Sequence, residues 1–278
     1  MACLSVSETT TFRWSFEEDI HRYRAAGIPA IGVWRQKLSD FGEEKGAELI
    51  VEADLRVSHL FWAGGFTGSD GRSYKAAVDD AREAIQTAAE LKTRCLIVYS
   101  GSRGTHTFNH ARRLFRDALK ELTPLAQEFD IYLGVEPMHP GCGCEFTFVS
   151  DIEEFLRLVD AVGSDRVKLV FDTYHLGLTP DIVAQIPRLV PHIVLVQLGD
   201  AKRPPQGEVN RCLLGEGVIP VKAIVDALLD NGYDGFFDVE LIGEDVEHCD
   251  YTQLLEHARK AYEQLVGPIG PLAVSQES

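Results

Sequence analysis

The chain has 278 residues, which is long enough for one large domain or two small ones with a sizeable core. Hydrophobic residues make up 45% of the chain and charged residues 25%, a composition that excludes a disordered chain. Acidic residues outnumber basic residues by 43 to 27, which gives a formal net charge of −16. Because a duplex-binding protein needs cations that face phosphates, this balance argues against nucleic acid as the main partner.

The apolar runs are short and strand-like, so we expect no membrane-spanning segment. The first residues contain neither a basic segment nor a long apolar one, so we expect no signal peptide. Six cysteines are too few for a disulfide scaffold in a chain of this size, and we interpret them as reduced thiols of a cytoplasmic protein. Cys142 and Cys144 form the only close pair, and the sequence offers no further soft ligands at a recognisable metal-site spacing.

Short β-type runs alternate with amphipathic helix-type segments from one end of the chain to the other. We expect eight strands, at residues 3–7, 30–34, 57–62, 95–101, 131–138, 167–175, 193–200 and 235–242. Helices are expected at residues 16–26, 74–91, 108–129, 152–162, 181–189, 221–230 and 251–266. Serines precede several of these helices as N-caps and glycines follow several at their C-terminal ends, namely Ser15, Ser73, Ser150, Gly27, Gly163 and Gly232.

The predicted strands are continuous apolar runs instead of strict alternations of apolar and polar residues, as at 167–171 and 193–196. Strands that are buried on both faces have this pattern, and helical crossovers bury parallel sheets on both faces. Eight strand–helix units therefore predict an α/β fold, a single-domain (β/α)₈ TIM barrel over residues 1–266. Residues 267–278 are expected to form a C-terminal tail outside it. A doubly wound parallel sheet is the alternative, because counting strands does not exclude it.

Polar residues stand at similar depth at the ends of the last four predicted strands. They are Glu136, Asp172, Gln197 and Glu240. In TIM barrels the catalytic side chains lie at the C-terminal ends of strands, and a buried polar group needs a partner. Three of the four are carboxylates, whose mutual repulsion a divalent cation would relieve. Oxygen ligands favour Mn²⁺ or Mg²⁺, with Co²⁺ and Zn²⁺ as alternatives. The sequence contains no Walker loop, no dinucleotide-binding glycine motif and no nucleophilic serine elbow.

The motifs around these four positions resemble those of the xylose isomerase-like TIM-barrel superfamily, the sugar phosphate isomerase/epimerase group. The motifs are Val135-Glu-Pro137, Phe171-Asp-Thr-Tyr-His175, Gln197-Leu-Gly-Asp200 followed by Arg203, Leu214-Gly-Glu-Gly217, Gly232-Tyr-Asp-Gly235 and Val239-Glu240. The resemblance covers residues 1–266 and is strongest in the second half of the chain. Within this group the chain resembles ketose 3-epimerases and hydroxypyruvate isomerase.

This resemblance implies a divalent metal bound by Glu136, Asp172, Gln197 and Glu240. Ketose 3-epimerases usually have His where this chain has Gln197, whereas hydroxypyruvate isomerase-like members have Gln there. By resemblance to the epimerases, Glu136 and Glu240 are also the acid/base pair. They would move a proton beside a metal-bound carbonyl through an enediolate.

The resemblance also implies that His175 and Arg203 hold and polarise substrate oxygens. The alternatives are that His175 only supports Asp172 and that Arg203 is a solvated loop charge. Further candidates for contact with substrate are His139, Trp14, Trp62 and His106. The tryptophans would form an aromatic wall for a sugar-like ligand or else pack at the barrel rim.

The leading functional hypothesis is a metal-dependent isomerase or epimerase of a small keto sugar or hydroxy-keto acid. A lyase similar to inosose dehydratase is the nearest alternative, because it begins with the same proton abstraction. A non-catalytic sugar-binding barrel and an abasic-site endonuclease similar to endonuclease IV are further alternatives, and the acidic charge argues against the latter. The resemblance also implies a homo-oligomer, since relatives are often dimers or tetramers.

Overall fold

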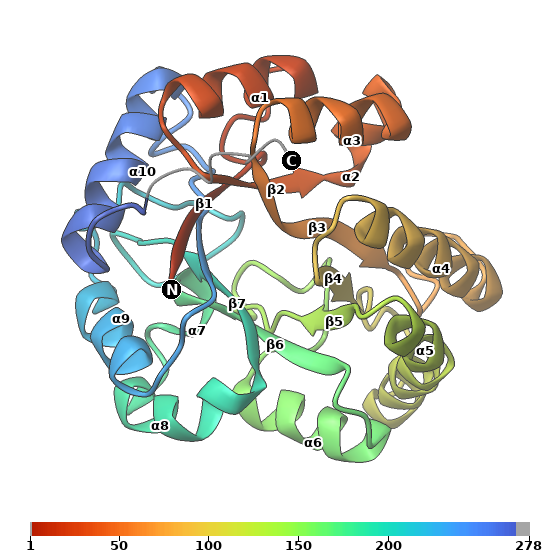
Figure 1. Ribbon diagram of the computed structural model, residues 1–278. Helices are drawn as coiled ribbons and strands as arrows, with labels where there is room; N and C mark the ends of the chain where they lie inside the picture. Colours follow the sequence, from red (N-terminus) through yellow and green to blue (C-terminus); the bar gives the residue numbers. More distant parts are fainter. Residues whose placement is uncertain (1, 271–278) are drawn as a thin grey trace.

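The computed structural model describes residues 2–270, which form a closed barrel of eight parallel strands with helices around it (Figure 1). The strands are β1 (Cys3–Ser7), β2 (Ala30–Trp34), β3 (Arg56–Gly64), β4 (Cys95–Tyr99), β5 (Tyr132–Val135), β6 (Val167–Asp172), β7 (Ile193–Leu198) and β8 (Phe236–Val239). The helices are α1 (Phe16–Ala25), α2 (Arg35–Phe41), α3 (Glu43–Glu52), α4 (Tyr74–Glu90), α5 (Phe108–Glu128), α6 (Ile152–Val162), α7 (Thr173–Leu176), α8 (Ile182–Leu189), the 3₁₀-helix η1 (Val190–His192), α9 (Val221–Asp230) and α10 (Tyr251–Leu265). Within residues 2–270, no helix is long and apolar enough to cross a membrane.

The barrel closes because β1 pairs in parallel with both β2 and β8. Each of the other strands pairs with its neighbours in chain order, which confirms the predicted TIM barrel and excludes the doubly wound sheet. In the registers of the last three strands, Asp172 lies opposite Gln197, and Leu198 lies opposite Val239. Side chains at the ends of β6, β7 and β8 are therefore brought to one level of the barrel.

Alternation along the strands decides which side chains face the interior of the barrel. On β4, Cys95, Ile97 and Tyr99 belong to a cluster with Val170 and Leu195, whereas Leu96 and Val98 pack in the larger core. Successive side chains of a strand point to opposite faces. Asp172 therefore shares the inward face with Val170, and Gln197 shares it with Leu195.

Several element boundaries differ from the sequence-based expectations. The strands β5 and β8 end before the expected residues 138 and 242, so Glu136 and Glu240 lie just beyond the strands. Pro137 has no N–H to donate to a strand ladder, which is consistent with the early end of β5. Ser15 and Ser73 cap α1 and α4 as predicted, but Asp151 caps α6 in place of Ser150.

The segment between β2 and β3 contains two helices, α2 and α3, which the sequence pattern had not indicated. Gly42 separates them with φ 109°, a backbone conformation that favours glycine. The small Gly46 of α3 allows close packing, since a Cβ there would lie 2.3 Å from Leu38. At the other end of the chain, residues 267–270 follow α10 without regular secondary structure, and 271–278 lie outside the described residues. The predicted boundary at residue 266 stays a prediction.

Candidate metal and substrate site

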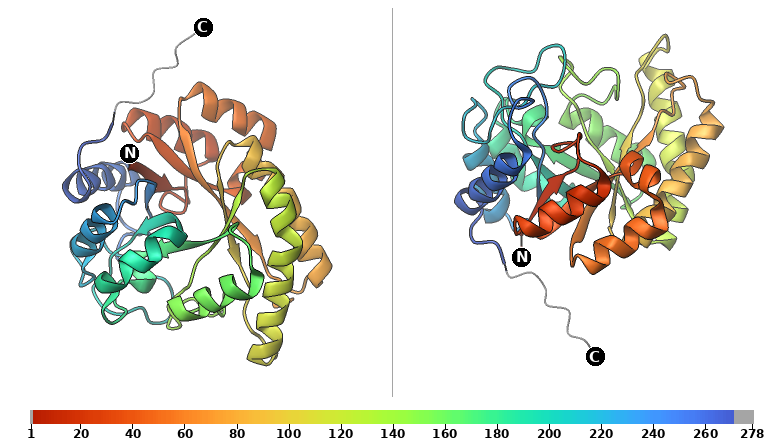
Figure 2. Two further views of the ribbon diagram at one scale, coloured as in Figure 1. Left: turned by 60° about the horizontal axis from the view of Figure 1, so that its bottom comes forward. Right: turned by 90° about the horizontal axis from the view of Figure 1, so that it is seen from above.

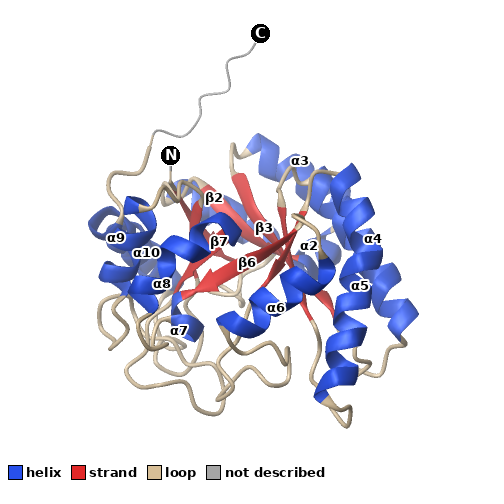
Figure 3. Ribbon diagram, turned by 90° about the horizontal axis from the view of Figure 1, so that it is seen from below, coloured by secondary structure: helices blue, strands red, loops and turns tan. Residues whose placement is uncertain are grey.

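The four residues predicted to bind a metal lie together at the C-terminal end of the barrel. Their exposed fractions are 1% for Glu136, 0% for Asp172, 1% for Gln197 and 6% for Glu240. Long loops and α7 gather at this end, and the N-terminus leaves from the opposite end (Figures 2 and 3). The burial of three carboxylates in one place requires cations or hydrogen-bond donors to stabilise them.

On one side of the cluster, Glu136 is held by Tyr99 and faces His175. The Tyr99 hydroxyl donates to Oε2 of Glu136 at 2.5 Å. Nε2 of His175 lies 3.6 Å from Oε1 of Glu136 and 3.8 Å from Oδ2 of Asp172. Ligand atoms of these two acids and His175 all lie within 4.8 Å of one another, close enough to hold one metal ion.

The hydrogen bonding of His175 indicates a role other than that of a metal ligand. Its Nδ1 accepts a hydrogen bond from the backbone N–H of His139 at 3.3 Å, so the ring proton lies on Nε2. Burial lowers the pKa of His175 to about 3, which keeps the ring neutral. Within the described residues Nε2 has no hydrogen-bond partner. An Nε2–H without a partner beside two carboxylates is suited to donate to a substrate oxygen.

On the other side of the cluster, two hydrogen-bond donors and one cation hold Glu240. Thr9 Oγ1 donates to Oε1 of Glu240 at 2.8 Å, and Gln197 Nε2 donates to Oε2 at 3.2 Å. Nη2 of Arg211 lies 2.9 Å from Oε2 of Glu240 and 2.5 Å from Oδ2 of Asp172. The guanidinium of Arg211 therefore joins two of the predicted metal ligands.

Arg211, and not the predicted Arg203, is the arginine that the structure brings to the cluster. Arg211 is 2% exposed, whereas Arg203 is exposed on the loop after β7, and no ion pair of it is found within residues 2–270. The spacing from Gln197 pointed to Arg203, but spacing along a chain does not show where a long loop returns. The position of Arg211, four residues before Gly215 of the Leu214-Gly-Glu-Gly217 motif, could have drawn attention to it.

The electrostatics of the cluster leave an excess of negative charge. Burial and the neighbouring Asp172 and Glu240 raise the pKa of Glu136 well above its ordinary value. Burial also raises the pKa of Glu240, although Arg211 opposes this rise. Arg211 is one cation against three acids. In the part of the chain that the structure describes, Gln197 Oε1 is buried with no hydrogen-bond partner. An unpaired amide oxygen among crowded carboxylates fits a hard divalent cation with oxygen ligands.

The remaining substrate-binding candidates differ in their distance from this cluster. His139 adjoins it through its N–H to His175, and its own Nδ1 accepts from Gly141 N at 3.0 Å. Trp62 adjoins it through Tyr99, with ring centroids 5.5 Å apart. The structure does not bring the other two candidates to the acids. Trp14 packs edge-on against Tyr251 at 5.2 Å, and Nε2 of His106 is 3.0 Å from the carbonyl oxygen of Thr67.

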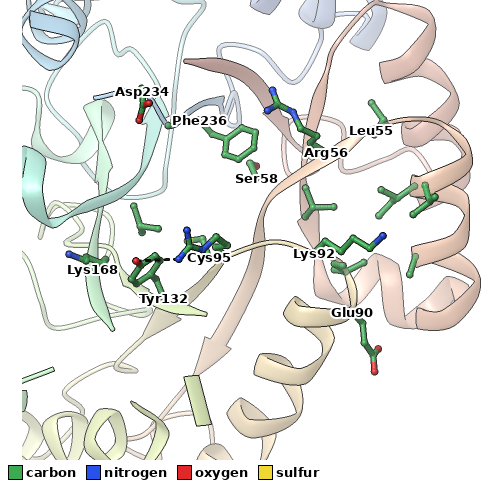
Figure 4. Close-up of a pocket in the computed structure, with 18 of the residues that line it drawn as sticks. Leu55, Arg56, Ser58, Glu90, Lys92, Cys95, Tyr132, Lys168, Asp234 and Phe236 are labelled. Atoms are coloured by element: carbon green, nitrogen blue, oxygen red, sulfur yellow. Dashed lines mark hydrogen bonds between the residues drawn. The ribbon is translucent and has the colours of Figure 1, made fainter. Parts of the chain in front are cut away.

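A cavity of about 630 Å³ lies at the opposite end of the barrel, among the first residues of several strands (Figure 4). It is lined by apolar side chains such as Leu55 and Phe236 and by cations such as Arg56, Lys92 and Lys168. None of the four predicted metal ligands lines it. Because catalytic groups of TIM barrels lie at the C-terminal ends of the strands, this cavity is separate from the candidate site.

Comparison with known proteins bears on what this cluster does. A family model described as xylose isomerase-like TIM barrel matches residues 20–265. Over 117 residues the chain is 32% identical to a D-psicose 3-epimerase from Enterocloster bolteae, a match that spans 42% of this chain but 36% of that enzyme. It is 22% identical to an inosose isomerase from Bacillus velezensis over 72% of both chains.

Among solved structures, protein SMc04130 from Sinorhizobium meliloti is similar with a TM-score of 0.87 and 25% identity, over 94% of this chain and 98% of that one. The IOLI protein, solved with a bound zinc atom, has a TM-score of 0.82 and 18% identity, over 96% and 99%. An L-ribulose 3-epimerase has a TM-score of 0.77 and 21% identity, over 94% and 93%. The curated relatives of this chain thus include sugar epimerases and isomerases.

Proposed function

Because the chain belongs to the xylose isomerase-like TIM barrel family, we propose that it is a divalent-metal-dependent isomerase or epimerase of a small keto sugar or hydroxy-keto acid. The observation that carries this proposal is the buried set of Glu136, Asp172, Gln197 and Glu240 at the ends of four consecutive strands. The sugar epimerases and isomerases among its relatives support the same reaction class. Zinc in the structurally similar IOLI protein supports a divalent metal.

Glu136, Asp172, Gln197 and Glu240 would hold the metal through oxygen atoms. When bound, a divalent cation supplies a Lewis acid that makes the hydrogen beside a carbonyl more acidic. Mn²⁺ and Mg²⁺ suit this set best, and Zn²⁺ or Co²⁺ would also fit a site with an amide and three carboxylates.

The proton transfers fall to the two glutamates, which follow the ends of two different strands, β5 and β8. One carboxylate removes the proton beside the substrate carbonyl, and the other returns a proton to the neighbouring or the same carbon. Tyr99 fixes one oxygen of Glu136 and Thr9 fixes one oxygen of Glu240, which leaves each side chain a defined orientation. Such fixed positions lower the barrier, because the groups need not reorganise during the reaction.

Substrate oxygens would be bound by donors that lack a partner in this structure. Nε2–H of His175 and Nε–H of Arg211 are both buried, and neither has a hydrogen-bond partner among residues 2–270. Two unpaired donors in one site favour a substrate that has several oxygen atoms, such as a keto sugar. The role of Arg203 in substrate binding stays a prediction.

The test is to incubate the Mn²⁺-supplemented protein in D₂O with a panel of ketopentoses, ketohexoses, inososes and hydroxy-keto acids such as hydroxypyruvate. We expect deuterium to enter the substrate at the carbon beside the carbonyl, with an isomer or epimer as product. The variants Glu136→Gln and Glu240→Gln should lose this exchange, whereas the exposed Glu247→Gln should retain it.

Product mass separates the alternatives. A product lighter by one water would indicate the lyase, which shares the first step. Absence of deuterium exchange with every substrate of the panel, although Mn²⁺ is bound, would contradict the proposed isomerase. Sugar binding without exchange would then favour the non-catalytic barrel.

A further inference from the structure

The side chain of Arg211 occupies an unusual position for a cation beside a metal site. Both carboxylate contacts are made by the same nitrogen, Nη2, at 2.5 Å from Asp172 Oδ2 and 2.9 Å from Glu240 Oε2. Nη2 donates a hydrogen bond to Asp172 Oδ2 and forms an ion pair with Glu240 Oε2, so one nitrogen contacts two predicted metal ligands. The contacts are buried, with side-chain exposures of 3% for Arg211 and 0% for Asp172.

The surroundings hold Arg211 in this position. The backbone N–H of Arg211 donates to Ile242 O at 2.8 Å, and its guanidinium carbon lies 4.7 Å from the centre of the Tyr174 ring. The absence of a side chain at Gly199 makes room for it, since a Cβ there would lie 2.8 Å from Nε of Arg211. The side chain therefore reaches the carboxylates along a path built by three separate segments.

The two carboxylates that Arg211 contacts are among those that would hold a metal ion. A metal ion on Asp172 and Glu240 needs lone pairs of their carboxylates. Arg211 donates to Asp172 Oδ2 and pairs with Glu240 Oε2, so it competes for oxygens of the same two carboxylates. The two cations also repel each other, and this repulsion is stronger between buried side chains than at the surface. In the metal-free protein, however, Arg211 relieves the repulsion between the two acids.

We propose that Arg211 is an internal counter-cation that competes with the metal: it stabilises the metal-free carboxylates and weakens the binding of a divalent ion. This inference rests on the proposed metal site. It adds that the chain itself carries a cation, Arg211, that opposes metal binding and favours release of the metal. Metal entry changes the contacts of Nη2 with Asp172 and Glu240, and metal loss restores them.

The test measures Mn²⁺ affinity by titration calorimetry on protein treated with EDTA, without reference to activity. We expect Arg211→Met to bind Mn²⁺ at least tenfold more tightly than the wild type, and its metal-free form to melt at a lower temperature. The matched control is Lys202→Met, which removes the same charge from an exposed side chain of the same loop. We expect its Mn²⁺ affinity to stay within twofold of the wild type.

A second measurement covers the case in which Arg211→Met does not fold. In wild-type protein with ¹⁵N-labelled arginine, we expect the Arg211 side-chain N–H signals to shift when diamagnetic Mg²⁺ saturates the site. Unchanged signals at saturation would overturn the proposal, as would unchanged or weaker Mn²⁺ binding by Arg211→Met.

The outcomes also separate this inference from the proposed function. Tighter Mn²⁺ binding by Arg211→Met, together with no deuterium exchange by the wild type, would retain the competition and reject the isomerase. Equal Mn²⁺ binding by the wild type and Arg211→Met, with deuterium exchange by the wild type, would reject the competition alone. If neither protein binds Mn²⁺, the metal site and the competition are both wrong.

Discussion

Two clusters of buried acids lie at the same end of the barrel, and they differ in how completely their polar atoms are paired. The first contains Glu8 just after β1, Asp19 of α1 and Lys37 of α2. Nζ of Lys37 donates to Asp19 and to Thr11 O, the latter at 3.0 Å. Thr11 Oγ1 also donates to Asp19 at 2.6 Å, and the backbone N–H of Trp34 donates to Glu8 at 2.6 Å.

The second cluster is the candidate site, with three acids and Arg211 as the cation near them. In the described part of the chain it leaves three buried polar atoms unpaired, on Gln197, His175 and Arg211, whereas the first cluster leaves one oxygen of Glu8. The comparison teaches that buried charge alone does not identify a functional site. Unpaired donors and acceptors that face the same space are the better indication of a missing ligand.

The largest expected effect separates the clusters by activity. We expect Glu136→Gln and Glu240→Gln to lower kcat by about 10²–10⁴-fold, the usual contribution of a positioned general acid or base. Lys37→Met should leave kcat per folded molecule nearly unchanged, because Lys37 contacts none of the proposed catalytic groups. Steady-state kinetics on a substrate found in the deuterium screen would measure this. A comparable loss in Lys37→Met would remove the distinction.

Stability should separate the clusters in the opposite sense. Lys37→Met removes the buried cation beside Asp19, and we expect it to lower the free energy of unfolding by about 3–5 kcal/mol. Asp172→Asn removes one of three mutually repelling acids, so we expect a much smaller loss in the metal-free protein. Urea denaturation of both variants would measure the difference. Equal losses would mean that the candidate site is as structural as the first cluster.

Metal addition should act on the second cluster alone. At a Mn²⁺ concentration of about 100 times its Kd, we expect the free energy of unfolding to rise by about 2.7 kcal/mol. Asp172→Asn should abolish most of this gain, and Lys37→Met should retain it in full. Thermal melts with EDTA and with added Mn²⁺ would show this. A full gain in Asp172→Asn would remove Asp172 from the ligand set.

The smallest effect, between pH 6 and pH 4.5, concerns a buried group that belongs to neither cluster. Burial lowers the pKa of His59 to about 3, whereas an unfolded histidine has a pKa of about 6.5. The unfolded chain therefore binds a proton that the folded chain does not. The contribution of His59 to stability is complete above pH 6.5 and is lost as the pH falls toward 3, at up to about 1.4 kcal/mol per pH unit.

The variant His59→Phe checks this effect, because it removes the titrating group and keeps a ring beside Gly32. We expect its free energy of unfolding to fall less steeply than that of the wild type between pH 6 and pH 4.5. Parallel curves for the two proteins would show that His59 takes up a proton without unfolding. His175 titrates in the same way in both proteins, so it cancels in the comparison.

The sequence by itself determined the barrel and the strand ends that carry the candidate site. Eight apolar runs separated by amphipathic segments leave few other ways to bury both faces of every strand. A strand end fixes the position of its side chain, which is why Glu136, Asp172, Gln197 and Glu240 could be placed together. The helices α2 and α3 were missed, because their pattern is interrupted at Gly42.

Only the tertiary structure decided which arginine and which proton face these acids. Arg203 and Arg211 belong to one long loop, and the backbone bond of Arg211 to Ile242 determines which of them returns to the barrel. The proton on Nε2 of His175 follows from the N–H of His139, which is distant in the sequence. Contacts of this kind depend on where loops return in space, and no spacing along the chain specifies that.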